Sequence, residues 1–289
     1  MTEVVDEEIA RLLVSCPDRP GIVAAISSRL AHAGANIISS HQFSTDPEGG
    51  SFFLRLEFHL SGLAGRLPAL RDELATLAEA WSMDLRIAAV SERKRVAVFV
   101  SRYEHCLLEL LWRWKRGELP VDLVAVVSNH PDLEAEVTGF GVPYLHIPVT
   151  RGTKRAAEQR ALELLAGRVD LVVLARYMQI LSGEFLSGLG APVINIHHSF
   201  LPAFAGANPY QRAHDRGVKL IGATAHYATE DLDEGPIIEQ DVTRVTHDHE
   251  PAVLERVGRD IERVVLAKAV TWHVQDRVMV HDNRTIVFP

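Results

Sequence analysis

An asparagine, two histidines and an aspartate lie in two apolar, strand-like stretches in the second half of this sequence. Asn195 and His197 belong to the first stretch, and His226 and Asp233 belong to the second, at 222–238. Residues two apart on a strand point to the same side, so Asn195 and His197 share a face. An amide can donate to a developing oxyanion, which is worth roughly 3 kcal/mol in acyl transfer, and an imidazole can donate or accept a proton near neutral pH. The residue types predict a site that polarises a small carbonyl and manages protons beside it.

Asp233 lies in a predicted loop between two strands, where its carboxylate can pair with His197 and fix the orientation of the imidazole. The sequence has no G-x-S-x-G nucleophile elbow, so direct attack on a bound carbonyl is favoured over a covalent acyl-enzyme. Structural interpretations stay open at this point. Asn195 could cap the turn after its strand, and His197 could be a core histidine with satisfied hydrogen bonds.

Metal binding is the competing chemistry for these residues. His197, His198, His226 and Asp233 are all possible ligands. No two of these histidines have the i, i+4 spacing of a helical zinc site, so we expect no metal. The histidines and acids at 247–250 also resemble a ligand set, but they precede a proline that opens a predicted helix, so helix capping is the better interpretation.

Composition narrows the class of protein. The chain has 289 residues, of which 47% are hydrophobic and 24% charged, and a formal net charge of −8. Because nonspecific nucleic-acid binding needs a basic surface, we expect no nucleic-acid partner. No segment reaches the ~20 apolar residues that span a bilayer, and the acidic N-terminus is unlike a secretory or transit peptide. The two cysteines, Cys16 and Cys106, are far apart, which is typical of a cytoplasmic protein with reduced thiols.

The first ninety residues predict one small α/β domain in the order βαββαβ, a ferredoxin-like sandwich. Asp18 is the predicted N-cap of the first helix, Pro20 lies in its first turn, and Gly34 ends it. The third strand alternates in polarity and is expected to be half buried. The predicted strands are 9–15, 36–43, 51–60 and 83–90, and the predicted helices are 22–33 and 67–81.

Residues 91–289 predict a second domain after a charged boundary. Its strands alternate with helices, which favours a doubly wound, mostly parallel, Rossmann-like sheet. Ligands bind such sheets at the carboxyl ends of the strands, where Asn195 and His197 lie. A terminal hairpin closes the chain. The predicted strands are 96–100, 123–128, 144–147, 170–175, 193–196, 223–228 and 237–245, and the predicted helices are 106–114, 132–139, 153–165, 182–189 and 250–273.

The first domain resembles the ACT family of regulatory domains. The resemblance rests on the turn from Asp18 to Gly21, the helix that follows, and the stretch from Gly34 to Ile37. It implies an amino-acid site between paired domains and therefore a homo-oligomer, either a dimer or a tetramer. Glycine and methionine are plausible effectors. A turn that only caps a helix is the alternative. The implied regulatory residues are Asp18, Arg19, Pro20, Gly21 and Asn36.

The second domain resembles the formyltransferase family that uses 10-formyltetrahydrofolate, because Asn-x-His is followed downstream by Leu-Asp-x-Gly-Pro. The resemblance implies that Asn195, His197 and Asp233 are catalytic and that no metal or other cofactor is needed. It also implies a pterin pocket lined by the segment after the fourth strand and closed by the loop before Asp233. The implied substrate-binding residues are Arg176, Tyr177, Met178, Gln179, Ile180, Leu181, His226, Asp231 and Leu232.

Within that family the sequence looks like the hydrolytic, deformylating branch, in which water accepts the formyl group and formate and tetrahydrofolate are the products. The loop at 100–106 contains no glycine, and Glu104 would repel a phosphate, which argues against a nucleotide acceptor. His198 stands where the transferases commonly have proline. Such an activity would balance one-carbon folate pools for purine synthesis.

Two other functions remain. One is formyl transfer to a small amine, with the acceptor bound by 101–105 and 204–210. The other is a binding regulator with an inactive site, against which the intact Asn195, His197 and Asp233 argue.

Overall fold

The computed structural model describes residues 7–46, 48–202 and 209–289. The chain divides into two compact units: the first runs to Arg93 and also takes in Val287–Pro289, and the second spans Lys94–Ile286. Within the described part of the chain, no helix is long and apolar enough to cross a membrane. The domain division expected after residue 90 stays a prediction.

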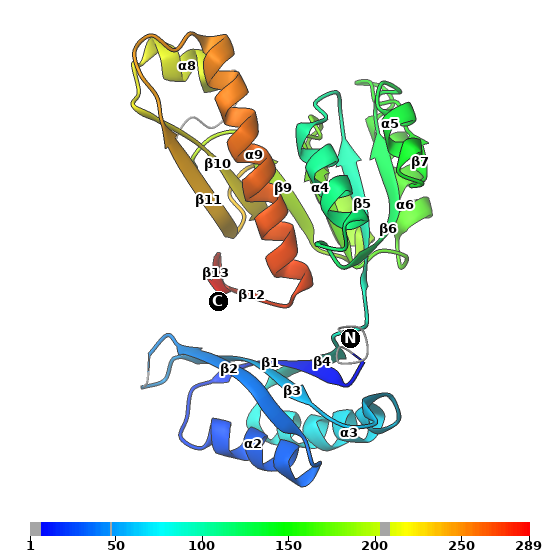
Figure 1. The fold of residues 1–289 in the computed structure, drawn as a ribbon, viewed down its shortest axis with the longest axis vertical. Helices are drawn as coiled ribbons and strands as arrows, with labels where there is room; N and C mark the ends of the chain where they lie inside the picture. Colours follow the sequence, from blue (N-terminus) through cyan, green and yellow to red (C-terminus); the bar gives the residue numbers. More distant parts are fainter. Residues whose placement is uncertain (1–6, 47, 203–208) are drawn as a thin grey trace. The chain divides into compact units, whose positions relative to one another are not determined.

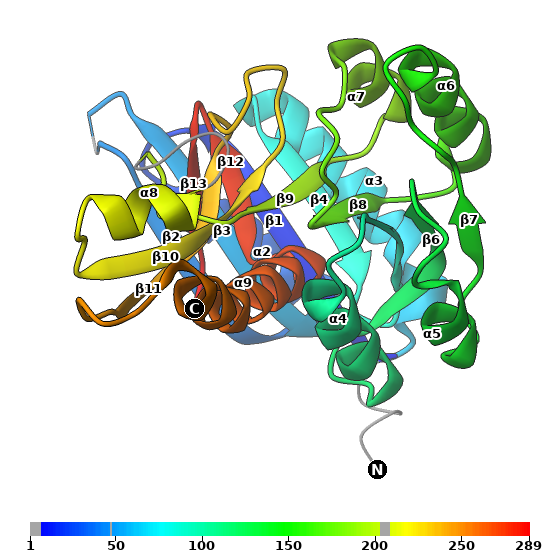
Figure 2. The same cartoon turned by 90° about the horizontal axis from the view of Figure 1, so that it is seen from above.

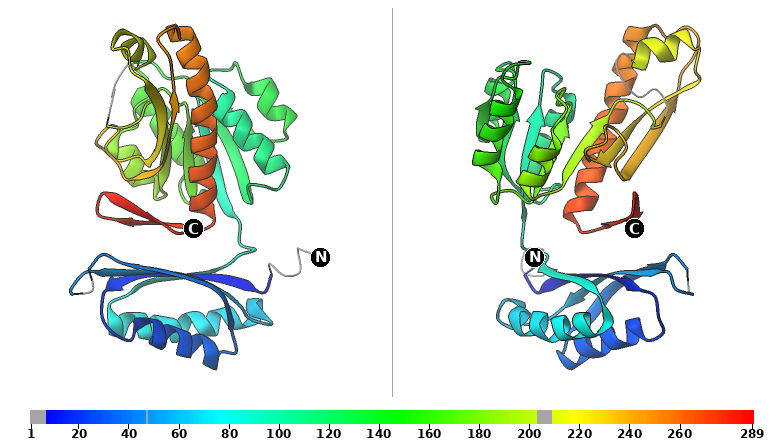
Figure 3. Two further views of the ribbon diagram at one scale, coloured as in Figure 1. Left: turned by 60° about the vertical axis from the view of Figure 1, so that its left-hand side comes forward. Right: turned by 180° about the vertical axis from the view of Figure 1, so that it is seen from behind.

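The first unit is a four-stranded antiparallel sheet in the order β2-β3-β1-β4. Its two helices lie on the same face of the sheet (Figures 1 and 3). Apolar residues of both helices and of β1 and β3 form a single core between the two layers, which confirms the predicted βαββαβ sandwich. The elements are β1 (Ile9–Pro17), α2 (Ile22–His32), β2 (Asn36–Ser44), β3 (Ser51–His59), α3 (Leu63–Trp81) and β4 (Asp84–Ala89).

Three local predictions for this unit were wrong. The N-cap of α2 is Gly21, at φ 94°, and not Asp18, whose carboxylate accepts a hydrogen bond from Ser44 Oγ. Helix α3 begins four residues earlier than expected and runs through Pro68. Strand β3 is buried without a break over 52–56. The buried run includes Arg55, which is paired with Glu57 at 2.8 Å, so polarity did not report which face is covered.

The second unit is built on a seven-stranded sheet in the order β11-β10-β9-β8-β5-β6-β7. The five strands from β7 to β9 are parallel, and β10 and β11 are antiparallel, which confirms a mostly parallel sheet. Figure 2 shows α4 and α5 on one face of the parallel part and α6 and α7 on the other. The strands are β5 (Lys94–Val100), β6 (Val121–Ser128), β7 (Tyr144–His146), β8 (Leu171–Ala175), β9 (Val193–His197), β10 (Leu220–Tyr227) and β11 (Ile237–Arg244).

The helices of this unit follow the predicted pattern with one addition, α8, which falls where a loop was expected. The long helix α9 packs along β9, β10 and β11 and against α4, as Figure 1 shows. The predicted terminal hairpin, β12 (Val278–His281) with β13 (Arg284–Val287), is present. The helices are α4 (His105–Lys115), α5 (Glu134–Gly139), α6 (Lys154–Leu165), α7 (Gly183–Leu189), α8 (Pro209–Asp215) and α9 (Pro251–Val274).

Strand β9 is the element that positions the site. It lies between parallel β8 and antiparallel β10, and all five residues of β8 are buried. A strand held on both edges fixes the direction of each of its side chains, since the alternation of faces follows from the ladder. The carboxyl end of β9 therefore presents Asn195 and His197 in a defined geometry.

Candidate active site

A cavity of about 830 Å³ opens at the carboxyl end of β9. All twelve catalytic and substrate-binding residues predicted from the sequence line it. They come from three places: the segment after β8, the strands β9 and β10, and the loop between β10 and β11. The structure thus brings together residues up to 57 positions apart, from 176 to 233. The predicted lining residues are Arg176, Tyr177, Met178, Gln179, Ile180, Leu181, Asn195, His197, His226, Asp231, Leu232 and Asp233.

The side chain of Asn195 is oriented by His226, its neighbour across the β9–β10 ladder. Asn195 Nδ2 lies 3.2 Å from His226 Nε2, and His226 Nδ1 lies 3.0 Å from the carbonyl oxygen of Tyr227. A carbonyl only accepts, so Nδ1 carries the proton and Nε2 accepts from the amide. Burial lowers the pKa of His226, which keeps the ring neutral. One N–H of Asn195 is thereby held, and the second is free for a ligand.

His197 and Asp233 form the predicted pair. His197 Nδ1 lies 3.3 Å from Asp233 Oδ2, and the other carboxylate oxygen lies 3.8 Å from His226 Nε2. The hydrogen bond with His197 lowers the pKa of Asp233 in spite of partial burial, so the carboxylate is ionised. His197 Nε2 is buried and makes no hydrogen bond to any part of the chain that the structure describes. The ring has its orienting partner on one nitrogen and faces the cavity with the other.

The loop that carries Asp233 is held from three sides. Asp233 itself has φ 61°, a left-handed conformation that is uncommon for a residue with a side chain. A Cβ on Gly235 would lie 1.8 Å from the carbonyl oxygen of Tyr227, so only glycine allows the loop to return to β10. Asn283, in the turn of the terminal hairpin, donates to the carbonyl oxygen of Glu234 at 2.9 Å. These contacts explain the Leu-Asp-x-Gly-Pro spacing in structural terms.

The segment after β8 divides its side chains between the cavity and the core. Tyr177 and Leu181 pack against the core of the unit, whereas Met178 and Ile180 are more than half exposed. Leu232, across the cavity, is exposed to a similar extent. Three exposed apolar side chains around one cavity suit a flat ring. Leu181 therefore belongs to the core, whereas Met178 and Ile180 do not.

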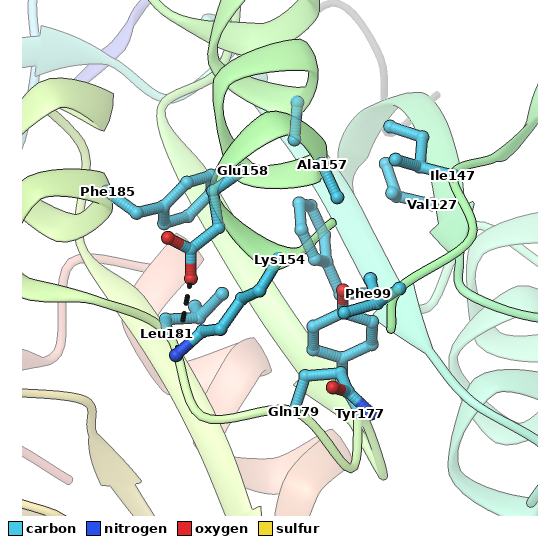
Figure 4. Close-up of a pocket in the computed structure, with 12 residues that line it drawn as sticks. Phe99, Val127, Ile147, Lys154, Ala157, Glu158, Tyr177, Gln179, Leu181 and Phe185 are labelled. Atoms are coloured by element: carbon cyan, nitrogen blue, oxygen red, sulfur yellow. Dashed lines mark ion pairs between the residues drawn. The ribbon is translucent and has the colours of Figure 1, made fainter. Parts of the chain in front are cut away.

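Figure 4 shows the small apolar pocket beneath this segment, which Tyr177 and Gln179 also line. The ring of Tyr177 lies edge-on to Phe99 at 5.3 Å. Burial and the nearby charge of Glu158 raise the pKa of Tyr177 to about 12. Lys154 and Glu158 form the ion pair drawn in the view, at 3.8 Å. This packing fixes the segment from below and leaves its exposed residues to the large cavity.

The guanidinium of Arg176 points away from the predicted pterin side. Its carbon lies 4.9 Å from the ring centroid of Tyr103, and its Nε lies 3.4 Å from Glu262 Oε2. His198 and Tyr210 line the same side of the cavity. The sequence indicated His198 as a possible metal ligand and as a mark of the deformylating branch, but not as a residue that lines the cavity. Glu262 gave no signal, because a single acid on an amphipathic helix normally faces solvent.

His198 stays neutral in this position. Burial first, then the positive charges of Arg176 and His197, lower its pKa to about 4, although Glu262 and Asp233 act in the opposite direction. A neutral imidazole offers one donor and one acceptor. His198 therefore adds a second polar ring to the cavity wall, 5.0 Å from the ring of His197.

Among the described residues, the histidines considered as metal ligands from the sequence do not form a group of ligands. The group whose ligand atoms lie within 4.8 Å of one another is His105, Cys106 and Glu262. Burial and the charge of Glu262 raise the pKa of the Cys106 thiol well above its usual value, which disfavours the thiolate that a metal requires. Pro251 does open α9, but Glu250 makes no side-chain capping hydrogen bond. The absence of a metal stays a prediction.

The predicted regulatory residues of the first unit fall at two ends of its sheet. Asp18, Arg19, Pro20 and Gly21 form the turn between β1 and α2, where the Arg19 guanidinium lies 3.7 Å from the ring centroid of Trp81. Asn36 pairs with His59, at the other end of β3 from Ser51, which faces Pro17. Eight residue steps along a strand separate the two places by roughly 26 Å. A site containing both would therefore need two copies of the chain.

The fold and this site define a formyl transferase domain that follows an ACT domain. The formyl transferase family profile matches residues 94–270, and the ACT domain profile matches residues 10–75. Formyltetrahydrofolate deformylase of Mycobacterium tuberculosis is 63% identical over 97% of this chain and 91% of its own length. The deformylase of Bacillus subtilis is 53% identical over 98% and 95%.

Solved structures agree with these sequence matches. The crystal structure of formyltetrahydrofolate deformylase from Burkholderia mallei has a TM-score of 0.92 and 46% identity, covering 98% of this chain and all of that one. Glycinamide ribonucleotide transformylase 1 from Symbiobacterium toebii has a TM-score of 0.62 and 30% identity, covering 68% of this chain and 95% of that one. The chain belongs to the formyltetrahydrofolate deformylase family.

Proposed function

We propose that this chain hydrolyses 10-formyltetrahydrofolate to formate and tetrahydrofolate. The observation that carries the proposal is the convergence of the Asn195 amide, the His197–Asp233 pair and three exposed apolar side chains on one cavity. The family relatives carry the same activity in their names. The site has the parts that hydrolysis of a formyl amide needs: an oxyanion donor, a proton carrier and a surface for a flat ring.

The folate is placed with its ring system against Met178, Ile180 and Leu232, and with its N10-formyl group beside Asn195. His226 holds one amide N–H of Asn195, so the other points at the formyl oxygen. His197, protonated, directs its Nε2–H to the same oxygen or to N10. Because Asp233 is ionised beside Nδ1, it orients the ring and stabilises its positive charge.

The reaction then follows the ordinary course of amide hydrolysis. Water forms a bond to the formyl carbon, and the carbonyl electrons move onto the oxygen, which Asn195 and His197 stabilise. The C–N10 bond breaks as the oxyanion collapses. The proton that water loses reaches N10 through His197, with Asp233 compensating its charge. The formic acid that forms loses its acidic proton to solvent, formate and tetrahydrofolate leave, and the site returns to its starting protonation.

Transfer to a small amine is the competing function. It would need an acceptor site on the side of the cavity that Tyr103 and Tyr210 line, which we call the acceptor side. Ser101, in the first predicted acceptor loop, is already engaged: Oγ donates to Asn129 Oδ1 at 2.7 Å and accepts from Met178 N at 3.0 Å. In the second loop only Pro209 and Tyr210 are among the described residues. The Ser101 hydroxyl and the Tyr210 phenol, which donates to Glu262 at 2.7 Å, have thus already used their only donor hydrogens on other groups of the chain.

The test is formate release by purified, chelator-treated protein with no acceptor added. Formate and tetrahydrofolate in equal amounts establish hydrolysis, whereas folate binding without formate would return the assignment to a transferase. Treatment with a chelator also addresses the proposal that neither a metal nor a cofactor takes part. Activity that returns only on adding a divalent cation would contradict it.

We also propose how the protein is regulated, how it assembles and what its role in the cell is. The ACT domain supports an amino-acid effector, for which glycine and methionine are the candidates, and the separation of Asn36 from the Asp18 turn supports a site shared between copies in a dimer or tetramer. We place the protein in the cytoplasm, with no nucleic-acid or membrane partner, as a control on one-carbon folate pools for purine synthesis. Titration of turnover with each amino acid checks the effector.

A further inference from the structure

Glu262, in the middle of α9, is a charged side chain that is only 1% exposed. One carboxylate oxygen accepts from Tyr210 at 2.7 Å, and the other lies 2.8 Å from His105 Nε2. Burial raises the pKa of Glu262, but the hydrogen bond from His105 and the charge of Arg176 outweigh it, so the pKa is lowered. Glu262 is therefore a fixed negative charge beside Arg176, which itself lines the cavity.

The helix is shaped so that Tyr210 can reach this carboxylate. Gly258 lies one turn before Glu262 on α9, and a Cβ there would be 1.9 Å from the Tyr210 hydroxyl. Glycine inside a helix destabilises it by roughly 0.5–1 kcal/mol relative to alanine. The close approach of Tyr210 accounts for a glycine at this position. The sequence of α9 therefore makes room for the Tyr210–Glu262 contact.

The cation next to Glu262 is Arg176, whose positive charge Glu262 compensates. Its Nε lies 3.4 Å from Glu262 Oε2, its guanidinium lies over the ring of Tyr103, and it is 7% exposed. Its backbone is left-handed, at φ 62°. Nε and Nη1 are buried and make no hydrogen bond to any described residue. Arg176 thus retains unused donors next to the cavity, while its charge is compensated by Glu262.

We propose that Glu262 is a specificity-determining residue that reserves the acceptor side of the cavity for water by compensating Arg176. This inference rests on the proposed hydrolytic function. An acceptor that carries a phosphate would need an uncompensated cation in this part of the cavity, and Arg176 is the buried candidate among the described residues that line the cavity. With Glu262 in place, an incoming anion meets a compensated arginine and a second buried charge of its own sign. Water, which is neutral and small, carries neither penalty.

The contacts of His105, Cys106 and Glu262 also disfavour a metal site. A cation at His105, Cys106 and Glu262 would lie beside Arg176 and would need the thiolate of a cysteine that burial keeps protonated. The donors around Glu262 already satisfy its two oxygens. The arrangement therefore serves to hold a carboxylate against an arginine.

The experiment is a titration with inorganic phosphate, followed by ³¹P line broadening in the absence of folate and by the apparent KM in its presence. Ionic strength is held constant with chloride, because phosphate also screens surface charges. Wild-type protein is expected to show weak binding and no competition. Glu262→Gln keeps the shape of the side chain and releases Arg176, so its phosphate dissociation constant should fall at least about tenfold, or about 1.4 kcal/mol.

Glu109→Gln is the matched control, since Glu109 is also paired with arginines, Arg113 on α4 and Arg263 on α9, but neither of these arginines lines the cavity. It should bind phosphate as weakly as the wild type. Gly258→Ala displaces Tyr210 without removing the charge, so it should not gain phosphate affinity either. Gain in Gly258→Ala equal to that in Glu262→Gln would assign the effect to packing.

Two outcomes overturn the proposal: competitive phosphate binding by the wild type as tight as by Glu262→Gln, or a folded Glu262→Gln protein with unchanged phosphate affinity. If Glu262→Gln does not fold, Glu262→Asp takes its place. Its shorter side chain withdraws from Arg176, and it should bind phosphate more tightly than the wild type. Failure of the hydrolytic function is separate, because it appears as absent formate release in the wild type, whereas the line-broadening titration needs no turnover.

Discussion

Two carboxylates, Asp233 and Glu262, each pair with a histidine, the first in the wall of the cavity and the second beside Arg176, and they are built in different ways. Asp233 is on a loop, its side chain is 11% exposed, and its contacts to His197 and His226 are 3.3 and 3.8 Å. Glu262 is on a helix, its side chain is 1% exposed, and its contacts to His105 and Tyr210 are 2.8 and 2.7 Å.

The difference separates a charge that takes part in chemistry from a charge that defines a wall. Asp233 is bound loosely enough for its partner His197 to exchange protons with a ligand. Glu262 has short contacts on both carboxylate oxygens, and it therefore holds Arg176 and Tyr210 in place. Each of the following substitutions changes one of these two carboxylates or a residue of the same site.

The largest effect on turnover is expected from Asp233→Asn. The amide keeps the shape of the side chain but no longer stabilises a charged His197, and loss of the acid in a comparable triad lowers kcat about 10⁴-fold. We expect a loss of at least about 10³-fold in kcat, with the unfolding midpoint close to that of the wild type. The control is Asp122→Asn, an exposed acid on β6. Near-normal turnover by Asp233→Asn would remove Asp233 from the catalytic set.

Glu262→Ala should give the largest loss of stability. It leaves His105, Tyr210 and Arg176 facing a buried gap, and breaking a buried ion pair by removing one partner destabilises by about 3–5 kcal/mol. Denaturant unfolding measures the change, with Asp260→Ala, an exposed acid on the same helix outside the cavity, as the reference. Equal stability of the two variants would contradict the description of Glu262 as a fixed charge.

Asn195→Ala tests the oxyanion donor. Removal of one such donor lowers kcat by about 10²–10³-fold. The KM should change little, because the interaction strengthens only as the oxyanion forms. Steady-state kinetics of formate release decides the point. His226→Ala should show the same pattern with a smaller loss, because it frees the amide without removing it, and a larger loss than in Asn195→Ala would give His226 a role of its own.

His198, between the two carboxylates, should make stability depend on pH. Its pKa is about 4 in the folded chain and about 6.5 when exposed. The unfolded chain thus binds a proton below pH 6.5 that the folded chain refuses. This contribution is complete above pH 6.5 and is lost as the pH falls towards 4, by on the order of 3 kcal/mol. Urea unfolding of wild type and His198→Asn between pH 4 and 7 should show a shallower slope for the variant; parallel curves would contradict it.

The smallest effect is expected at the apolar rim. Met178→Ala removes part of the surface assigned to the flat ring, so KM should rise a few-fold, by about 1 kcal/mol, with kcat unchanged. Val242→Ala, which changes another exposed apolar residue, on β11 outside the cavity, is the control. A rise in KM of the same size in both variants would show that the rim does not bind the folate.

The sequence predicted the fold and the catalytic side of the cavity because both depend on local patterns. Buried parallel strands appear as apolar runs, and Asn195, His197 and Asp233 lie in two short segments with a recognisable spacing. The acceptor side was not predictable in the same way. Glu262 is 86 residues from Arg176 and 157 from His105, and only the packing of α9 on α4 brings them together. The burial of Arg55 on β3 escaped prediction for a different reason, because a local ion pair with Glu57, two residues away, replaces the apolar pattern.

Arg176 and Asp233 share a left-handed backbone, which is strained for any side chain but that of glycine and tolerated best by asparagine and aspartate. A library of variants sorted only by thermal stability would therefore enrich glycine or asparagine at 233, whereas at 176 the loss of the ion pair with Glu262 would outweigh the relief of backbone strain. The survivors would be more stable proteins without the acid that orients His197. Engineering of this fold for stability needs a selection for turnover as well as for heat resistance, because at position 233 stability and catalysis favour different residues.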